Sequence, residues 1–76
     1  MKELLEYIAR NLVDSPDDVS VAETERDGVV TLSLSVASGD MGKVIGRQGR
    51  IVREIRTLLK AVGQRGGQKV MVEIVE

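Results

Sequence analysis

The sequence predicts an α+β domain whose helices and strands follow the order α-β-β-α-α-β. Two features predict it. The spacing of apolar residues switches along the chain between the period of an amphipathic helix and the alternation of a strand. Short segments rich in glycine, proline or aspartate separate these periodic stretches. A hairpin would join the first two strands, and a helical crossover to the third strand favours a parallel pair. We therefore expect a three-stranded mixed sheet with the helices on one face.

The chain opens with a predicted helix over residues 2–13 and a predicted strand over residues 19–26. The helix is indicated by apolar side chains that fall on one face when they are spaced at 100° per residue. These side chains are Leu4, Leu5, Ile8 and Leu12. The turn between helix and strand is expected at residues 14–17, because Pro16 cannot continue the helix.

The second strand is the clearest in the sequence, over residues 29–36. The pair Asp27-Gly28 in front of it is a strong signal for a two-residue hairpin turn. Apolar residues alternate along the strand with side chains that mostly carry hydroxyl groups. The apolar set is Val30, Leu32, Leu34 and Val36. Such alternation predicts a sheet with one face against the core and one face free of helices.

The crossover contains two predicted helices, a short one over residues 41–45 and a longer one from Arg50 to about Val62. Asp40 is a suitable N-cap for the first of them. The longer helix has an apolar arc of about 120° opposite a charged face. The apolar arc contains Ile51, Val52, Ile55, Leu58, Leu59 and Val62.

A glycine-rich segment at residues 63–67 is expected to end the long helix, since glycine is favoured just past a helix C-terminus. Residues 68–75 then predict the last strand, in which alternate side chains are apolar. These are Val70, Val72 and Ile74.

Composition restricts the chemistry that the chain can perform. Its 76 residues suffice for one small domain with one modest core. Cysteine and histidine are both absent, which excludes disulfides, zinc sites built on these residues and a histidine general base. No cofactor is expected. No apolar run reaches membrane-spanning length and the start of the chain lacks a signal-peptide pattern, so we expect a cytoplasmic location and no membrane partner.

Charge is distributed unevenly along the chain, although the net charge is only −1. Residues 1–42 carry three basic and nine acidic side chains, whereas residues 43–76 carry eight basic and three acidic ones. A partner experiences the local field rather than the total charge. The second half of the chain is therefore a candidate surface for an anionic partner; the alternative is a solvated surface with uneven charge.

The basic half begins with the segment Gly46-Arg47-Gln48-Gly49, which lies between the two crossover helices. Glycine lets the chain turn tightly and approach a partner closely. The N–H groups at the start of the following helix carry partial positive charge, and Lys43 and Arg50 add full charges on either side. A negatively charged, extended backbone is the partner that such a loop fits. The alternative is a purely structural turn between two helices.

The run Met41-Gly42-Lys43-Val44-Ile45-Gly46-Arg47-Gln48-Gly49-Arg50 closely resembles the small stand-alone bacterial KH-domain RNA-binding proteins of the KhpA type. The opening Glu3-Leu4-Leu5-Glu6-Tyr7-Ile8 and the segment Leu12-Val13-Asp14 are similar to that family too. The resemblance extends over residues 1–76 and implies a single KH domain of the type II fold. The glycine-rich residues 63–67 depart from the family pattern.

The resemblance implies a non-enzymatic protein that binds single-stranded RNA, as a post-transcriptional regulator or RNA chaperone. Its GxxG loop would hold about four nucleotides. Arg47 and Gln48 would touch the sugar-phosphate backbone, with Lys43 and Arg50 beside phosphates. It also implies a homodimer, or a heteromer with a larger RNA-binding protein of the KhpB (Jag) type.

Several side chains near the loop have two interpretations. KH domains hold bases in an apolar groove, and Ile45 is our candidate for that groove, whereas Val52 is expected in the core. Ile51 is a candidate for either the core or a subunit contact. The basic residues further along the helix either bind RNA or form a solvated face. They are Arg53, Arg56 and Lys60.

Aromatic residues make up 1% of the chain, and the single one, Tyr7, is expected to pack in the core. The chain therefore cannot stack bases on aromatic side chains as many single-strand binders do. Weak binding by one unit is expected, which favours a second copy or a partner.

Other functions fit the sequence less well. A Walker loop requires a Lys-Ser or Lys-Thr pair after its glycines, and a dinucleotide fold requires the full G-x-G-x-x-G; neither is present. An enzyme is disfavoured because the acidic residues cluster away from the glycine loop. The remaining alternative is a protein-interaction or assembly module that uses the apolar surfaces of the same fold.

Overall fold

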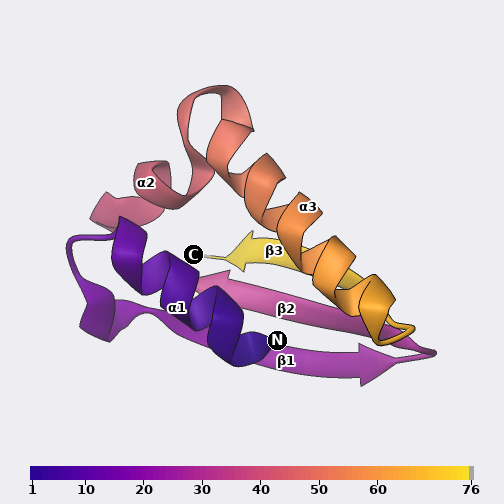
Figure 1. The fold of residues 1–76 in the computed structure, drawn as a ribbon. Helices are drawn as coiled ribbons and strands as arrows, with labels where there is room; N and C mark the ends of the chain where they lie inside the picture. Colours follow the sequence, from indigo (N-terminus) through magenta and orange to yellow (C-terminus); the bar gives the residue numbers. More distant parts are fainter. Residues whose placement is uncertain (76) are drawn as a thin grey trace.

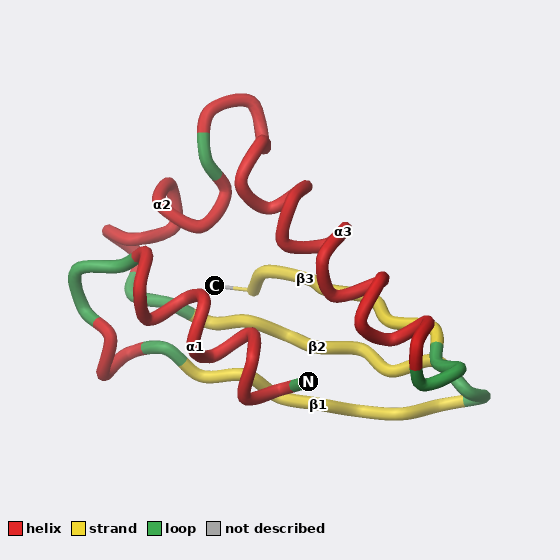
Figure 2. Tube along the Cα trace, viewed as in Figure 1, coloured by secondary structure: helices red, strands yellow, loops and turns green. Residues whose placement is uncertain are grey.

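The structure is a computed structural model, and it describes residues 1–75. Within this range, helices and strands follow the predicted order α-β-β-α-α-β. The helices are α1 (Lys2–Leu12), α2 (Met41–Ile45) and α3 (Arg50–Arg65), and the strands are β1 (Ser20–Arg26), β2 (Val29–Ser35) and β3 (Lys69–Val75). Figures 1 and 2 show all of these helices on the same side of the sheet. The predicted α+β class is confirmed.

Over residues 1–75 the sheet has three strands in the order β1-β2-β3, so β2 lies in the centre. β1 and β2 are antiparallel and β2 and β3 are parallel, which confirms the predicted mixed sheet. The hairpin turn has positive φ at both central positions, 54° at Asp27 and 78° at Gly28. This is the geometry of a type I′ turn, whose twist matches that of the flanking strands.

The core lies between the sheet and the helices. Side chains of β2 alternate between buried and half-buried, and those at the start of β3 alternate between exposed and buried. The strands contribute Val21, Val30, Leu32, Leu34, Val70 and Val72, and the helices contribute Leu5, Ala9, Val44, Ile55 and Leu59. On the opposite face of the sheet, Ser33 Oγ donates a hydrogen bond of 2.7 Å to Glu73 Oε1. One face is therefore packed against the helices and the other is more exposed and mostly polar, as the alternation predicted.

The end of α3 differs from the prediction. The helix continues through Gly63 and ends at Arg65, rather than near Val62. Gly63 is buried, and a Cβ built on it would lie 2.4 Å from Val70 Cγ2. This glycine therefore allows α3 to pack closely on β3, and it does not terminate the helix.

The helix is ended instead by Gly67, which has a φ of 72°. The N–H of Gly67 donates to the carbonyl of Gln64 at 3.0 Å, and the N–H of Gln68 donates to the carbonyl of Gly63 at 2.9 Å. This pair of bonds is the Schellman motif, which satisfies the last carbonyls of a helix. The glycine-rich segment is thus both a packing contact and a helix cap.

Some apolar side chains expected in the core are exposed. Tyr7 is 68% exposed, Leu58 46% and Val62 37%. Tyr7 follows Leu5 by about 200° around α1, so it points away from the sheet when Leu5 points into the core. Leu58 and Val62 lie on the side of α3 that the sheet does not cover, because the predicted apolar arc is wider than the strip that contacts β3.

Among the helices formed by residues 1–75, we find none with the length and apolar character required to cross a membrane.

Candidate nucleic-acid interface

The segment between α2 and α3 projects beyond the two helices, away from the sheet (Figure 1). α2 ends at Ile45, Gly46 follows it, and residues Arg47–Gly49 form a single turn of 3-10 helix, η3, before α3 begins. Arg47 and Gln48 are exposed. The backbone leaves helical geometry at Gly46, with φ 78° and ψ 172°, so α2 and α3 are separate helices. The structure thus places the glycine loop at the expected position between two helices.

The two glycines of the loop are required for different reasons. A Cβ on Gly46 would lie 2.6 Å from Ile51 Cγ1 and 2.9 Å from the Ile51 nitrogen, in addition to its positive φ. Gly49 also has a positive φ of 73°, but the nearest atom to its Cβ position, Val52 Cγ1, is 3.9 Å away. Gly46 is therefore fixed by both packing and conformation, and Gly49 by conformation alone.

Gln48 adopts the left-handed conformation with φ 58° and ψ 27°, which is uncommon for a residue other than glycine. Its carbonyl accepts a 2.8 Å hydrogen bond from Arg53 Nη2 on the first turns of α3. Arg53 therefore braces the loop from the helix. The sequence placed Arg53 on a basic helix face but gave no signal of this contact, which depends on the fold of the loop back toward α3.

Positive charge surrounds the loop. Arg47 and Arg50 are exposed, and within residues 1–75 neither forms an ion pair. Both guanidinium groups are consequently free to meet an anion. Arginine is well suited to phosphate because its planar fork of N–H donors matches two phosphate oxygens.

Lys43 has partners inside the protein, in contrast to the arginines. Its Nζ lies 3.2 Å from Asp14 Oδ2 and 3.6 Å from Asp40 Oδ1. The hydrogen bond with Asp14, supported by the charges of Asp14 and Asp40, raises the pKa of Lys43 above its usual value. The sequence predicted Lys43 as a phosphate neighbour; the structure shows an ammonium group that joins α2 to the turn after α1.

Asp40 is buried, with 3% of its surface exposed. It stands at the N-cap position of α2, but its carboxylate makes no capping bond there. Its oxygens accept instead the backbone N–H groups of Asp14, at 3.2 Å, and Ser15, at 3.0 Å. Burial alone would raise the pKa of Asp40, but these two bonds and Lys43 outweigh it and hold the pKa below its usual value. The predicted cap is thus a long-range link between two turns.

Comparison with known proteins identifies the arrangement. A family model described as "KhpA/KhpB, KH domain" matches residues 2–74. The chain belongs to this family. It is 52% identical over 75 residues to the "RNA-binding protein KhpA" of Clostridium acetobutylicum, covering 99% of this chain and all of that protein. It is 49% identical to the protein of the same name from Listeria monocytogenes, over the whole of both chains. The protein of that name from Chlamydia trachomatis is 47% identical, over 100% of this chain and 97% of the relative. No solved structure matches the chain significantly.

Apolar residues beside the GxxG loop of this KH domain divide into core and surface. Val44 is completely buried and Val52 is 8% exposed, as expected for packing residues. Ile45 and Ile51 are half-buried and pack against the core. Of the two, Ile51 lies directly beneath Gly46, which favours packing over a subunit contact. Ile45 precedes the loop and retains exposed surface, which is what a contact with a base would require.

Further along α3, Arg56 is also bound by the KH fold itself. Its Nε donates a 3.1 Å hydrogen bond to the carbonyl of Val72 on β3. In the three-stranded sheet of residues 1–75, β3 is an edge strand whose outer carbonyls lack a strand partner. Arg56 therefore fastens α3 to this edge, and the interpretation of a purely solvated helix face is wrong for it.

Proposed function

We propose that this protein is a non-enzymatic binder of single-stranded RNA that clamps the RNA backbone with the loop at residues 46–49. The observation that carries the proposal is the exposed loop, which is left-handed at Gln48, is braced by Arg53, contains Arg47 and is followed by Arg50, with neither arginine in an ion pair within residues 1–75. Its relatives from three genera are named RNA-binding proteins, and the KhpA/KhpB family is not an enzyme family. GxxG loops of KH domains clamp about four nucleotides of backbone.

Each residue of the interface has a proposed role. Gly46 and Gly49 adopt the positive φ values that the tight loop requires, so that a phosphate can approach its backbone. Arg47 and Gln48 contact the sugar-phosphate backbone, and Arg50 binds a phosphate. Ile45 supports a base. Lys43 acts indirectly, by holding α2 against the turn after α1, because its ammonium group is paired with Asp14 and Asp40.

The context of binding follows from the same proposal. Residues 1–76 would act as one KH domain in the cytoplasm, as a post-transcriptional regulator or RNA chaperone. One domain with few aromatic residues binds few nucleotides, so a homodimer or a complex with a protein of the KhpB (Jag) type would supply the second contact. A second candidate function, an assembly module, is favoured by the exposed Leu58 and Val62 on α3.

The decisive experiment replaces Arg47 and Gln48 with Asp. We expect RNA binding to be abolished, since two new negative charges would face phosphates at short range. The melting temperature should stay nearly the same, because both side chains are exposed. Binding is measured by fluorescence anisotropy with single-stranded RNA.

The matched control replaces Thr24 and Arg26 with Asp. This pair is exposed on β1 and changes the net charge by the same amount. Retained RNA affinity in the control, together with loss in the loop variant, supports the clamp. Unchanged RNA affinity in the loop variant would refute it and leave the assembly module as the better explanation.

A further inference from the structure

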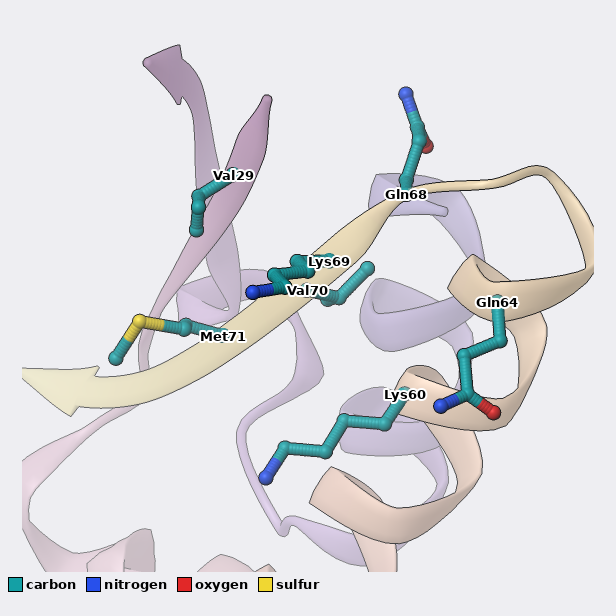
Figure 3. A pocket seen from close by; sticks show the side chains of 7 residues that line it. All are labelled: Val29, Lys60, Gln64, Gln68, Lys69, Val70 and Met71. Carbon is teal, nitrogen blue, oxygen red and sulfur yellow. The ribbon is translucent and has the colours of Figure 1, made fainter. Parts of the chain in front are cut away.

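A pocket of about 270 Å³ lies at the other end of α3 from the GxxG loop. Figure 3 shows how its walls are built: Lys60 and Gln64 extend from α3, Gln68 directly precedes β3, Lys69 to Met71 begin β3, and Val29 comes from β2. The helix rise of about 1.5 Å per residue puts Lys60 roughly 15 Å from Arg50 along the helix axis. The pocket is thus distinct from the glycine loop, at the outer edge of the sheet.

The lining of this pocket combines three kinds of chemistry. Val29 and Met71 provide accessible apolar surface, and Met71 is 59% exposed although it is a large apolar residue, whereas Val70 is 4% exposed and packs in the core. Gln64 and Gln68 provide amide groups that both donate and accept hydrogen bonds. Lys60 and Lys69 provide two positive charges, and no acidic side chain is among the lining residues from the described range 1–75. Apolar surface for a base, amides for its edge and ammonium groups for phosphate together match a nucleotide.

A continuous basic line joins the pocket to the loop. Arg53, Arg56, Lys60 and Gln64 follow one another at spacings of three or four residues, which places them along one side of α3. Arg53 contacts the loop at Gln48, Arg56 contacts the edge strand at Val72, and Lys60 and Gln64 line the pocket. The side of α3 that begins at the clamp is therefore the same side that faces the pocket.

We propose that this pocket is a second RNA site that binds one nucleotide beyond those held by the GxxG loop. The base rests against Val29 and Met71, Gln64 contacts its edge, and Lys60 and Lys69 bind its phosphate. The proposal rests on the proposed function, because it assumes that RNA is held at the loop. It adds that RNA longer than about four nucleotides gains contacts along α3.

The test compares four- and eight-nucleotide single-stranded RNAs on the whole protein. Lys60→Ala with Lys69→Ala should weaken the eight-nucleotide RNA roughly tenfold near 0.15 M salt and leave the four-nucleotide RNA unaffected. The slope of log affinity against log salt for the longer RNA should become shallower by about 1.4, because two phosphate contacts are lost at about 0.7 each. Both lysines are exposed, so the melting temperature should not change.

The matched control is Arg10→Ala with Arg65→Ala, which removes two exposed positive charges that do not line the pocket. If only the general loss of positive charge mattered, the lysine and arginine double variants would weaken RNA binding equally, and this result would overturn the site. Equal weakening of both RNA lengths, or no weakening of the longer one, would also overturn it. The loop variant Arg47→Asp with Gln48→Asp separates the two claims: its failure to reduce binding refutes the clamp, whatever the lysine variants show.

A free nucleotide has the same chemistry as the proposed RNA segment, so a third arm titrates a nucleoside monophosphate and follows the Met71 methyl signal by NMR. Saturable binding that is lost in the Lys60→Ala, Lys69→Ala variant, without any effect of that variant on the longer RNA, would assign the pocket to free nucleotides and overturn the RNA site. The RNA site is supported if the lysine variant binds the eight-nucleotide RNA more weakly and the monophosphate binds weakly or not at all.

Discussion

Single glycine positions show how closely α3 packs on its neighbours. At its N-terminal end the missing Cβ of Gly46 makes room for Ile51, and near its C-terminal end the missing Cβ of Gly63 makes room for Val70. Both contacts would otherwise be shorter than 3 Å, a separation that real Cβ atoms essentially never show. The two ends of the helix are thus positioned by glycines, which in turn fixes where the loop and the pocket lie.

Replacing Gly63 with Ala should therefore destabilise the protein, by roughly 1–3 kcal/mol, as overpacking of a core does. Because alanine is a better helix former than glycine, the substitution would increase the free energy of unfolding if packing against β3 did not matter. Chemical denaturation measures the free energy of unfolding. Gly42→Ala is the control, because nothing lies within 4 Å of its Cβ position, and it should gain roughly 0.5–1 kcal/mol. Equal stability changes in the two variants would contradict the packing role of Gly63.

Asp40 and Lys43 predict how stability depends on pH. The pKa of Asp40 is lowered in the folded state, so its contribution is present above its ordinary value of 3.8 and is lost as pH falls through the folded value. The pKa of Lys43 is raised, so its contribution is present below its ordinary value of 10.5 and is lost as pH rises through the folded value.

Asp40→Asn should accordingly lower the melting temperature at neutral pH, and the deficit should shrink as the medium is acidified below the ordinary pKa of 3.8. Melting curves across the acidic range measure this. Asp17→Asn, an exposed change in the turn η1 (Pro16–Asp18), is the control and should match the unmodified protein at neutral pH. A deficit for Asp40→Asn that stays constant through strong acid would show that its carboxylate charge contributes nothing.

At the scale of whole elements, most of the fold could be predicted because local patterns and tertiary packing agree. β2 alternates in sequence and in burial, and the Asp27-Gly28 turn has the backbone that its composition requires. The end of α3 could not be predicted, since the reason for Gly63 is a contact with β3 and not a local preference. The apolar arc of α3 was correct as a pattern, but the sequence does not say how much of it the sheet covers.

The loop and its brace form one functional element. The sequence predicts the position of residues 46–49 from the glycines and charges, whereas the bond from Arg53 to the Gln48 carbonyl depends on a left-handed turn that Gln does not signal. Likewise, Asp40 was predicted as a local cap because its partners, Asp14 and Ser15, are some 25 residues away in sequence.

Arg53→Met should loosen the loop without unfolding the protein. The net value of a hydrogen bond is about 0.5–1.5 kcal/mol, so RNA affinity should fall roughly two- to tenfold. Amide exchange at Gln48 and Gly49 should become faster, which separates a brace from a phosphate contact. Glu54→Met serves as the control, since Glu54 is an exposed neighbour on the same helix. Weaker RNA binding with unchanged exchange at the loop would mean that Arg53 binds RNA directly.

For the molecule as a whole, the distribution of charge indicates a surface for RNA, and the exposed apolar side chains indicate a surface for a protein partner. The basic second half of the chain supplies the loop and α3, and the acidic first half supplies α1 and β1. This separation favours contact of RNA with the loop and α3 and disfavours contact with α1 and β1. The sequence showed this division of charge, but it did not show which apolar surface is available to a partner. In the structure Ile51 packs against the core, so the exposed Leu58 and Val62 replace it as the candidate subunit contact.

We expect a two-fold homodimer through this part of α3, since a two-fold pair is the simplest closed assembly and it would bury both exposed side chains. Sedimentation at micromolar concentration without RNA should then give twice the 8.3 kDa chain mass. Leu58→Lys should give a monomer with a melting temperature that does not fall on dilution, and it should bind RNA more weakly because the second clamp is lost. Tyr7→Lys changes a more exposed apolar side chain on α1 and should leave the dimer intact. A single 8.3 kDa species for the unmodified protein across this range would rule out a stable homodimer, and the exposed face of α3 would then be the surface to test with a partner of the KhpB type.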